Sequence, residues 1–112
     1  MSENSHGGRR LADLGRRLGP RGLLLLGCRE DVLAVIVRHR VSRIRVFGSV
    51  ARGEDTEASD IDLLVDIDRP TLIDLIALNQ DLGELLGRVD VSTPAVLKPH
   101  VRERALAEAV VL

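Results

Sequence analysis

The apolar and polar positions of this chain predict helices and strands that follow one another in a small domain. Apolar residues recur at helical spacing through residues 29–40, and residues 43–47 then alternate as a strand does. Residues 61–67 alternate again, and we expect a second strand whose two faces differ. Its apolar face carries Ile61, Leu63, Val65 and Ile67, and its other face carries Asp60, Asp62, Leu64 and Asp66.

A helix, a strand and a further helix are predicted after this strand. Thr71, followed three residues later by Asp74, indicates a capped helix start, and Gly87 indicates the helix end. The apolar stripe of this helix is interpreted as core and consists of Leu72, Leu75, Ile76, Leu82 and Leu86. A strand over residues 88–92 and a helix over residues 101–110 follow. The order predicts an α/β (α+β) fold with a small mixed β-sheet and flanking helices.

The segments between and before these elements are rich in turn residues. Ser49 is expected to cap a short helical turn over residues 50–52 that Gly53 closes, and residues 54–59 are expected to form a polar, solvated loop. Residues 1–22 are rich in Gly and Arg, so we expect a flexible N-terminal tail with at most a short helix inside it. The folded domain is then expected to span residues 23–112.

Composition removes several classes of protein. The chain of 112 residues is one domain of ordinary size, and its only aromatic residue is Phe47, which argues against a protein that stacks single-stranded nucleic acid on aromatic rings. Its only cysteine is Cys28, so neither an intrachain disulfide nor a cysteine zinc site is expected. The apolar run at residues 23–26 is too short for a signal peptide or a membrane span, so we expect a cytoplasmic protein.

Charge is distributed unevenly, although the net charge is −1. Residues 1–45 hold ten arginines and four acidic residues, whereas the remainder holds six basic and 13 acidic residues. A basic region next to an acidic one suits a metal site beside a phosphate or a partner surface. For most of these arginines, however, we expect ordinary surface positions.

Three aspartates are candidate metal ligands. Asp60 and Asp62 are two residues apart on a predicted strand, so their side chains point the same way. Asp90 lies between two valines that would face the core, so it would point to the opposite face. If the two strands are neighbours, the three carboxylates converge, and such a cluster stays ionised only with divalent cations, for which oxygen ligands favour Mg²⁺ or Mn²⁺. Taken alone, each aspartate is more typical of surface charge.

The Gly48–Ser49 pair is a candidate phosphate site. A glycine at a strand end lets a phosphate approach the backbone closely, and the following helical turn offers free N–H groups to an anion. Ser49 adds a hydroxyl donor, and it also fits a helix cap. Arg52 fits either a phosphate contact or an ion pair with a nearby carboxylate. The sequence contains neither a P-loop nor a Rossmann glycine pattern, so these residues are the nucleotide site that it predicts.

These runs of residues resemble a known family. Gly48–Glu54 contains a Gly-Ser pair, and Ser59–Val65 contains an Asp-x-Asp sequence after a spacer of ten residues. Together with Val89–Val91, they resemble the signature of the polymerase-beta-like nucleotidyltransferases, and above all its minimal branch, the stand-alone MNT domains. The resemblance runs from about residue 29 to the C-terminal end. It implies the polymerase-beta-like nucleotidyltransferase fold, phosphate binding by Gly48 and Ser49, and catalytic metal ligation by Asp60, Asp62 and Asp90.

The resemblance also implies a reaction and a partner. The reaction would move a nucleoside monophosphate, AMP from ATP, to a hydroxyl group, with two Mg²⁺ ions about 3.5–4 Å apart and pyrophosphate as the leaving group. Stand-alone MNT proteins pair with a HEPN-type ribonuclease toxin and act as its antitoxin by adenylylating a toxin tyrosine. A similar hetero-oligomer is therefore expected, without direct nucleic-acid or membrane contacts. Because this sequence contains no tyrosine, the modification would act on another chain.

Two other functions stay open at the level of sequence. The chain could be a binding module that silences its partner by contact, or it could transfer a nucleotide to a small molecule such as an aminoglycoside. The retained trio of carboxylates argues against a module without catalysis. A small-molecule acceptor would need an additional lobe, which this chain could gain only by dimerising.

Overall fold

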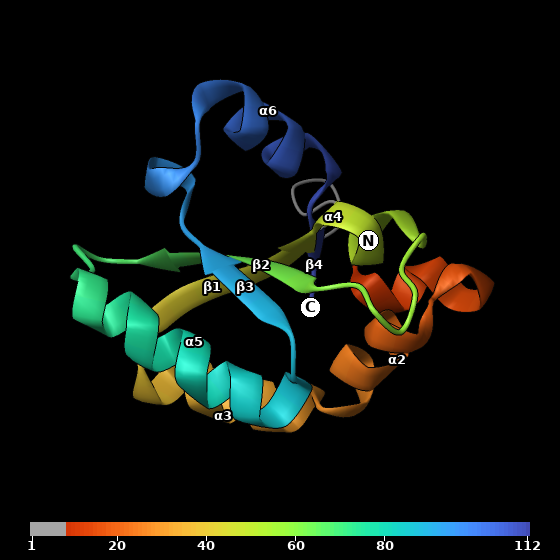
Figure 1. Ribbon diagram of the computed structural model, residues 1–112, viewed down its shortest axis with the longest axis horizontal. Coiled ribbons are helices and arrows are strands. Elements are labelled where there is room, and N and C mark those ends of the chain that lie inside the picture. Colours follow the sequence, from red (N-terminus) through yellow and green to blue (C-terminus); the bar gives the residue numbers. More distant parts are fainter. Residues whose placement is uncertain (1–8) are drawn as a thin grey trace, which may run out of the picture.

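The computed structural model describes residues 9–112 and is built around a four-stranded sheet with the order β3-β2-β1-β4. β1 (Val41–Phe47) runs antiparallel to β2 (Ile61–Ile67) and to β4 (Val110–Val111). β2 runs parallel to β3 (Val89–Ser92). The predicted mixed sheet with flanking helices is therefore confirmed (Figure 1).

Helices cover both faces of this sheet. α3 and α5 pack against each other below the sheet in Figure 1, and α6 lies over the opposite face. The short helix α4 connects β1 to the loop before β2, and η1 and α2 lie beside it at one end of the molecule. The bounds are η1 Leu11–Arg17, α2 Pro20–Gly27, α3 Arg29–Arg38, α4 Gly48–Arg52, α5 Leu72–Leu86, η2 Pro94–Val96 and α6 Pro99–Glu108. Within residues 9–112, no helix has the length and apolar character that a membrane span requires.

The central strand β2 has the bounds that the sequence predicts, and its apolar face is buried as expected. Ile61, Leu63 and Val65 are all fully buried in the main core. Leu64, which shares the other face with the aspartates, is fully buried as well. This side of the sheet is also covered, because η2 contacts β2 and α6 lies over the same side. The alternation of apolar and polar residues therefore identified the apolar face of the strand, but it did not show that the face with the aspartates is covered as well.

The apolar stripe of α5 is core along only part of its length. The helix begins with the predicted capping box, in which Thr71 and Asp74 exchange hydrogen bonds. Leu82 and Leu86 are buried, which confirms the core interpretation for the second half. The same interpretation is wrong for the first half, where Leu72 and Ile76 keep 73% and 49% of their surface exposed. Helical periodicity shows which side of a helix is apolar, but it does not show how far the neighbouring elements extend.

The last predicted helix ends earlier than the pattern indicates. A helix was expected over residues 101–110, but α6 ends at Glu108 and Val110 belongs to β4. Val110 and Val111 pair with Val46 and Arg45 of β1. Two β-branched residues at a free sheet edge gain ladder hydrogen bonds that another helical turn would not provide.

The N-terminal segment is packed on the domain over the residues that the structure describes. Residues 9–22 were expected to belong to a flexible tail, but they contain η1 and the start of α2, and Leu11 is fully buried in the core. The backbone N–H of Val111 also donates to the carbonyl of Arg9 at 2.8 Å. The part of that expectation that concerns residues 1–8 lies outside the described residues.

Asp55 holds this segment in place and is not the solvated loop residue that was expected. It keeps only 8% of its surface exposed. Its Oδ2 accepts hydrogen bonds from the backbone N–H groups of Arg21 at 2.7 Å and of Gly22 at 3.1 Å. A carboxylate at these first-turn N–H groups satisfies donors that have no partner within the helix. A residue 33 positions away in the chain thus caps α2, a relation that local sequence does not reveal.

Candidate functional site

The aspartates of β2 and β3 lie on one face of the sheet. In the parallel pairing of these strands, Asp62 is the direct partner of Asp90. Because partners in neighbouring strands point to the same side, the two carboxylates share a face, as the sequence leads one to expect. Asp60 precedes β2 by one residue and lies two positions before Asp62. This is the face over which α6 lies.

The electrostatics of the site centre on Asp62, which is half-buried while Asp60 and Asp90 are exposed. The pKa of the Asp62 carboxyl is raised from 3.8 to about 6. Burial is the main cause, and the negative charges of Asp90 and then Asp60 add to it. The positive charge of Arg52 lowers the same pKa in part. The surroundings of Asp62 thus disfavour its ionised form, and a bound cation would stabilise that form.

Asp62 and Asp90 share a face, and the charge of Asp60 reaches Asp62 as well. Among residues 9–112, no group of three His, Cys, Asp or Glu side chains is arranged to hold a metal ion. The donor chemistry nevertheless fits a hard divalent cation, because every candidate ligand is a carboxylate oxygen. The mutual repulsion on Asp62 is also what such a cation would relieve.

Gly48 joins the candidate phosphate turn to the aspartates. Its φ of +75° lies in the region that side chains rarely adopt. A Cβ atom at this position would also collide with the carboxylate of Asp62. Any other residue would therefore be strained here, by its backbone conformation and by its contact with Asp62. The candidate phosphate turn and Asp62, the carboxyl with the raised pKa, are therefore immediate neighbours.

The turn itself differs in one detail from the expectation. Ser49 was expected to cap a helical turn over residues 50–52, but α4 begins at Gly48, so Ser49 lies within its first turn. The flanking residue at the helix start is Phe47, and its side chain makes no capping hydrogen bond. Gly53 closes the helix in the left-handed conformation, as predicted. The helix can begin two residues earlier than expected because Gly48, unlike other residues, tolerates the positive φ of this position.

Glu108 from the end of α6 completes the site, and sequence reasoning missed it. Its Oε2 accepts a hydrogen bond from the backbone N–H of Gly48 at 2.7 Å. Its two carboxylate oxygens lie 3.1 and 3.2 Å from Nη1 of Arg52. Its charge is also one of the smaller influences that raise the pKa of Asp62. Glu108 lies 60 residues from Gly48 in the chain, and no local pattern marks it.

Arg52 forms ion pairs, which is one of its two expected roles. Its Nε donates to Glu54 at 2.9 Å, and its Nη1 donates to Glu108. These hydrogen bonds raise the pKa of the guanidinium above its ordinary value. The other expected role, a phosphate contact, stays a prediction.

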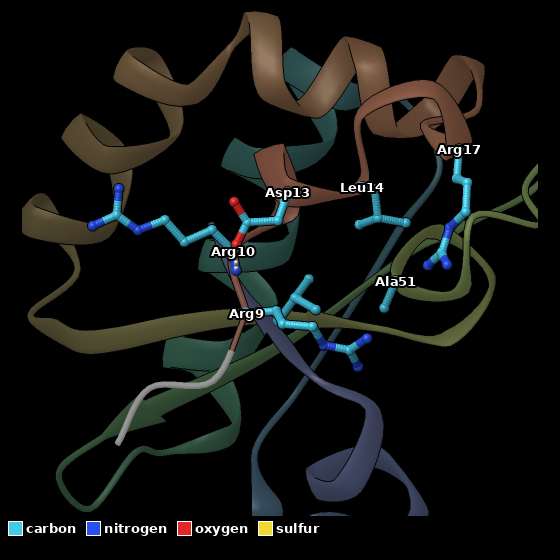
Figure 2. Close-up of a pocket in the computed structure, with 7 residues that line it drawn as sticks. Arg9, Arg10, Asp13, Leu14, Arg17 and Ala51 are labelled. Carbon is cyan, nitrogen blue, oxygen red and sulfur yellow. Dashed lines mark hydrogen bonds between the residues drawn. The ribbon is translucent and has the colours of Figure 1, made fainter. Parts of the chain in front are cut away.

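A basic cavity lies where the N-terminal segment meets α4. It has a volume of about 280 Å³ and is lined by Arg9, Arg10, Asp13, Leu14, Arg17, Ala51 and Val110. Figure 2 shows the guanidinium groups of Arg9 and Arg17 pointing towards Ala51 from two segments of the chain. None of the predicted site residues lines it. Part of the basic N-terminal charge is thus gathered here and not over the aspartates.

Comparisons with known proteins agree with this geometry. The model of the nucleotidyltransferase domain family matches residues 30–112. A protein of Methanocaldococcus jannaschii, provisionally named a protein adenylyltransferase, is 40% identical over 84 residues, which cover 73% of this chain and 90% of that protein. Protein adenylyltransferase MntA of Thermococcus cleftensis is 37% identical over 91 residues, which cover 72% of this chain and 92% of the relative.

Two solved structures share the fold. One is provisionally described as a minimal nucleotidyltransferase, and it aligns with a TM-score of 0.69 and 49% identity over 79% of this chain and 92% of its own. The other is a crystal structure of a toxin-antitoxin with AMP-PNP, which aligns with a TM-score of 0.63 over 71% of this chain and 68% of its own. At 21% identity, the second likeness concerns the fold alone.

Proposed function

Because the chain belongs to the nucleotidyltransferase domain family, we propose that it transfers AMP from ATP to a hydroxyl group of a partner protein. The family resemblance that the sequence carries agrees with this membership. The names of the two relatives, both protein adenylyltransferases, support AMP as the group transferred and a protein as the acceptor. The observation that carries the proposal is the pairing of Asp62 with Asp90, with the Asp62 carboxylate against Gly48.

Each site residue has a role in this proposal. Gly48 and Ser49 hold the phosphates through backbone N–H groups and the Ser49 hydroxyl, and Arg52 adds positive charge. Asp60, Asp62 and Asp90 would hold two Mg²⁺ ions, or Mn²⁺ in their place. When bound, these ions neutralise the triphosphate and make the acceptor hydroxyl easier to deprotonate.

The transfer is a single displacement at phosphorus. The acceptor oxygen forms a bond to the α-phosphorus, while the bond from this phosphorus to the bridging oxygen of the β-phosphate breaks. Pyrophosphate leaves with the electron pair of that bond. The hydroxyl proton passes to the Asp90 carboxylate, which is exposed and can return it to water. The protein contributes mainly by holding the triphosphate in line with the acceptor.

The partner in this proposal is a HEPN-type ribonuclease toxin that the chain inactivates as its antitoxin. The likeness in fold to a toxin-antitoxin structure supports a toxin as partner. The absence of tyrosine from the 112 residues supports an acceptor on another chain if the modified residue is a tyrosine. The two proteins would form a hetero-oligomer at least during transfer.

An AMP-transfer assay tests the proposal. The chain is incubated with a purified HEPN-type ribonuclease toxin, Mg²⁺ and ATP labelled at the α-phosphate, and label on the toxin is measured. We expect Asp62→Asn to reduce labelling by at least about a hundredfold, because it removes a carboxylate that would hold the ions neutralising the triphosphate. Asp68→Asn, in an exposed residue just after β2, is the matched control and should label as the unmodified chain does. Equal labelling by both variants would refute the proposed role of Asp62.

A further inference from the structure

The candidate phosphate site already holds an anion, and this anion belongs to the chain itself. The carboxylate of Glu108 accepts from the Gly48 N–H and pairs with the Arg52 guanidinium. These are the backbone donor and the cation that the proposed function assigns to the triphosphate. The Glu108 side chain keeps only 19% of its surface exposed, so this is an inserted group and not a loose surface pair.

The position of Glu108 in the fold keeps it at this place. It is the last residue of α6, and β4 begins two residues later. β4 is paired with β1, and Val110 and Leu112 are both buried. The backbone next to Glu108 is therefore anchored to the sheet. Only rotation of its side chain, or a shift of α6, can move the carboxylate away from Gly48.

We propose that Glu108 competes with the nucleotide for its own site: its carboxylate occupies the Gly48 N–H and the Arg52 guanidinium until a triphosphate displaces it. This inference rests on the proposed function, in that it takes these groups as the phosphate contacts. A carboxylate and a phosphate oxygen cannot both accept a hydrogen bond from the same N–H at the same time, and their negative charges repel each other. Binding of the nucleotide therefore includes the release of Glu108, which weakens the apparent affinity. It also frees the Glu108 side chain at the moment when the site is filled.

Calorimetric titration of the full chain with inorganic tripolyphosphate in Mg²⁺ buffer tests this competition directly. Glu108→Gln keeps the size of the side chain and removes its charge. We expect this variant to bind tripolyphosphate about five- to tenfold more tightly than the unmodified chain, because the hydrogen bonds to a charged group that must be broken are replaced by weaker ones. Glu108→Ala should show at least as large a gain, and AMP-PNP should follow the same order.

Two control variants separate the competition from other effects. Glu103→Gln changes the net charge equally on the same helix but in an exposed residue, so it should leave the affinity within about twofold. Glu54→Gln loosens the other ion pair of Arg52 without freeing the Gly48 N–H, so its gain should be smaller than that of Glu108→Gln. Circular dichroism checks that each variant is folded, and Glu108→Asp provides a milder change if the others are not. This variant shortens the reach of the carboxylate and should give a smaller gain.

The outcomes distinguish this inference from the proposed function. If Glu108→Gln binds tripolyphosphate equally or more weakly, Glu108 supports the phosphate site and the competition is refuted, whether or not AMP is transferred. If this variant binds more tightly but no form of the chain labels the toxin, the competition stands and the proposed function fails. If no form binds tripolyphosphate, the competition is refuted, and the labelling assay alone decides the proposed function.

Discussion

Truncation of Asp55 is the sharpest test of how the N-terminal segment is held. Asp55 is buried in the loop before β2, and its Oδ2 accepts from two backbone N–H groups of the first turn of α2. Asp55→Ala removes both hydrogen bonds at once. The packing of residues 9–27 against the domain should weaken as a result, although no apolar core residue is changed.

The expected loss follows from opposing contributions. Two hydrogen bonds to a charged acceptor contribute about 3–4 kcal/mol together. The other oxygen, Oδ1, is buried without a hydrogen-bond partner among the described residues, and such a group costs about 1–2 kcal/mol. The net loss on truncation is therefore about 2 kcal/mol, which lies at the upper end of measured helix-cap replacements. For a chain of this size, it corresponds to a fall of about 8 °C in Tm.

Thermal and urea unfolding, followed by circular dichroism, measure this loss. Glu57→Ala is the matched control because Glu57 is exposed in the same loop, and it should change the free energy of unfolding by less than about 0.5 kcal/mol. Asp55→Asn keeps one acceptor without the charge and should fall between the two. If Asp55→Ala unfolds within about 2 °C of the control, the carboxylate does not hold α2 and the reasoning fails.

Two further predictions concern the site. The folded-state pKa of Asp62 is raised to about 6, so ionisation of Asp62 destabilises the fold. As the pH rises from about 4 to 6, the unmodified chain should therefore lose stability relative to Asp62→Asn. In EDTA at pH 7, the Asn variant should be more stable than the unmodified chain by on the order of 1 kcal/mol, a value discounted because Asp62 is only half-buried. Urea titrations measure this gain in the free energy of unfolding. A gain that does not change with pH would contradict the ionisation of Asp62 as its cause. Gly48→Ala should cost at least about 2 kcal/mol in the same assay, from a positive φ and a collision with Asp62. Asp62→Gly in the same chain should recover the part due to the collision, and a double variant as unstable as Gly48→Ala alone would assign the whole cost to the backbone.

The sequence alone was sufficient for the elements whose signals are local. The strand at residues 61–67, the capping box of Thr71 and Asp74, and the closing role of Gly53 all agree with the structure. Each of these features depends on side chains within a few residues of one another, so the local sequence is enough to predict it. The family was also predictable, because its Gly-Ser and Asp-x-Asp residues lie close together in the chain, and the match over residues 30–112 confirms it.

The neighbourhood of Asp62 and Asp90 was predictable only in part. Alternation indicated the face of each strand, but only the sheet could establish that β3 pairs with β2 in the register that sets these two residues side by side. The catalytic and metal-binding roles of Asp60, Asp62 and Asp90 stay predictions, as do the phosphate contacts of Gly48, Ser49 and Arg52.

What the sequence determined by itself is thus the order of elements, the polarity of their faces and the chemical groups available to the site. What only the tertiary structure decided is which distant groups meet: Asp55 with the start of α2, Glu108 with Gly48, and solvent with the first turns of α5. The physical reason is that burial and hydrogen bonding depend on every element that packs against a residue. Propensity and periodicity, by contrast, report only on the residue's own segment.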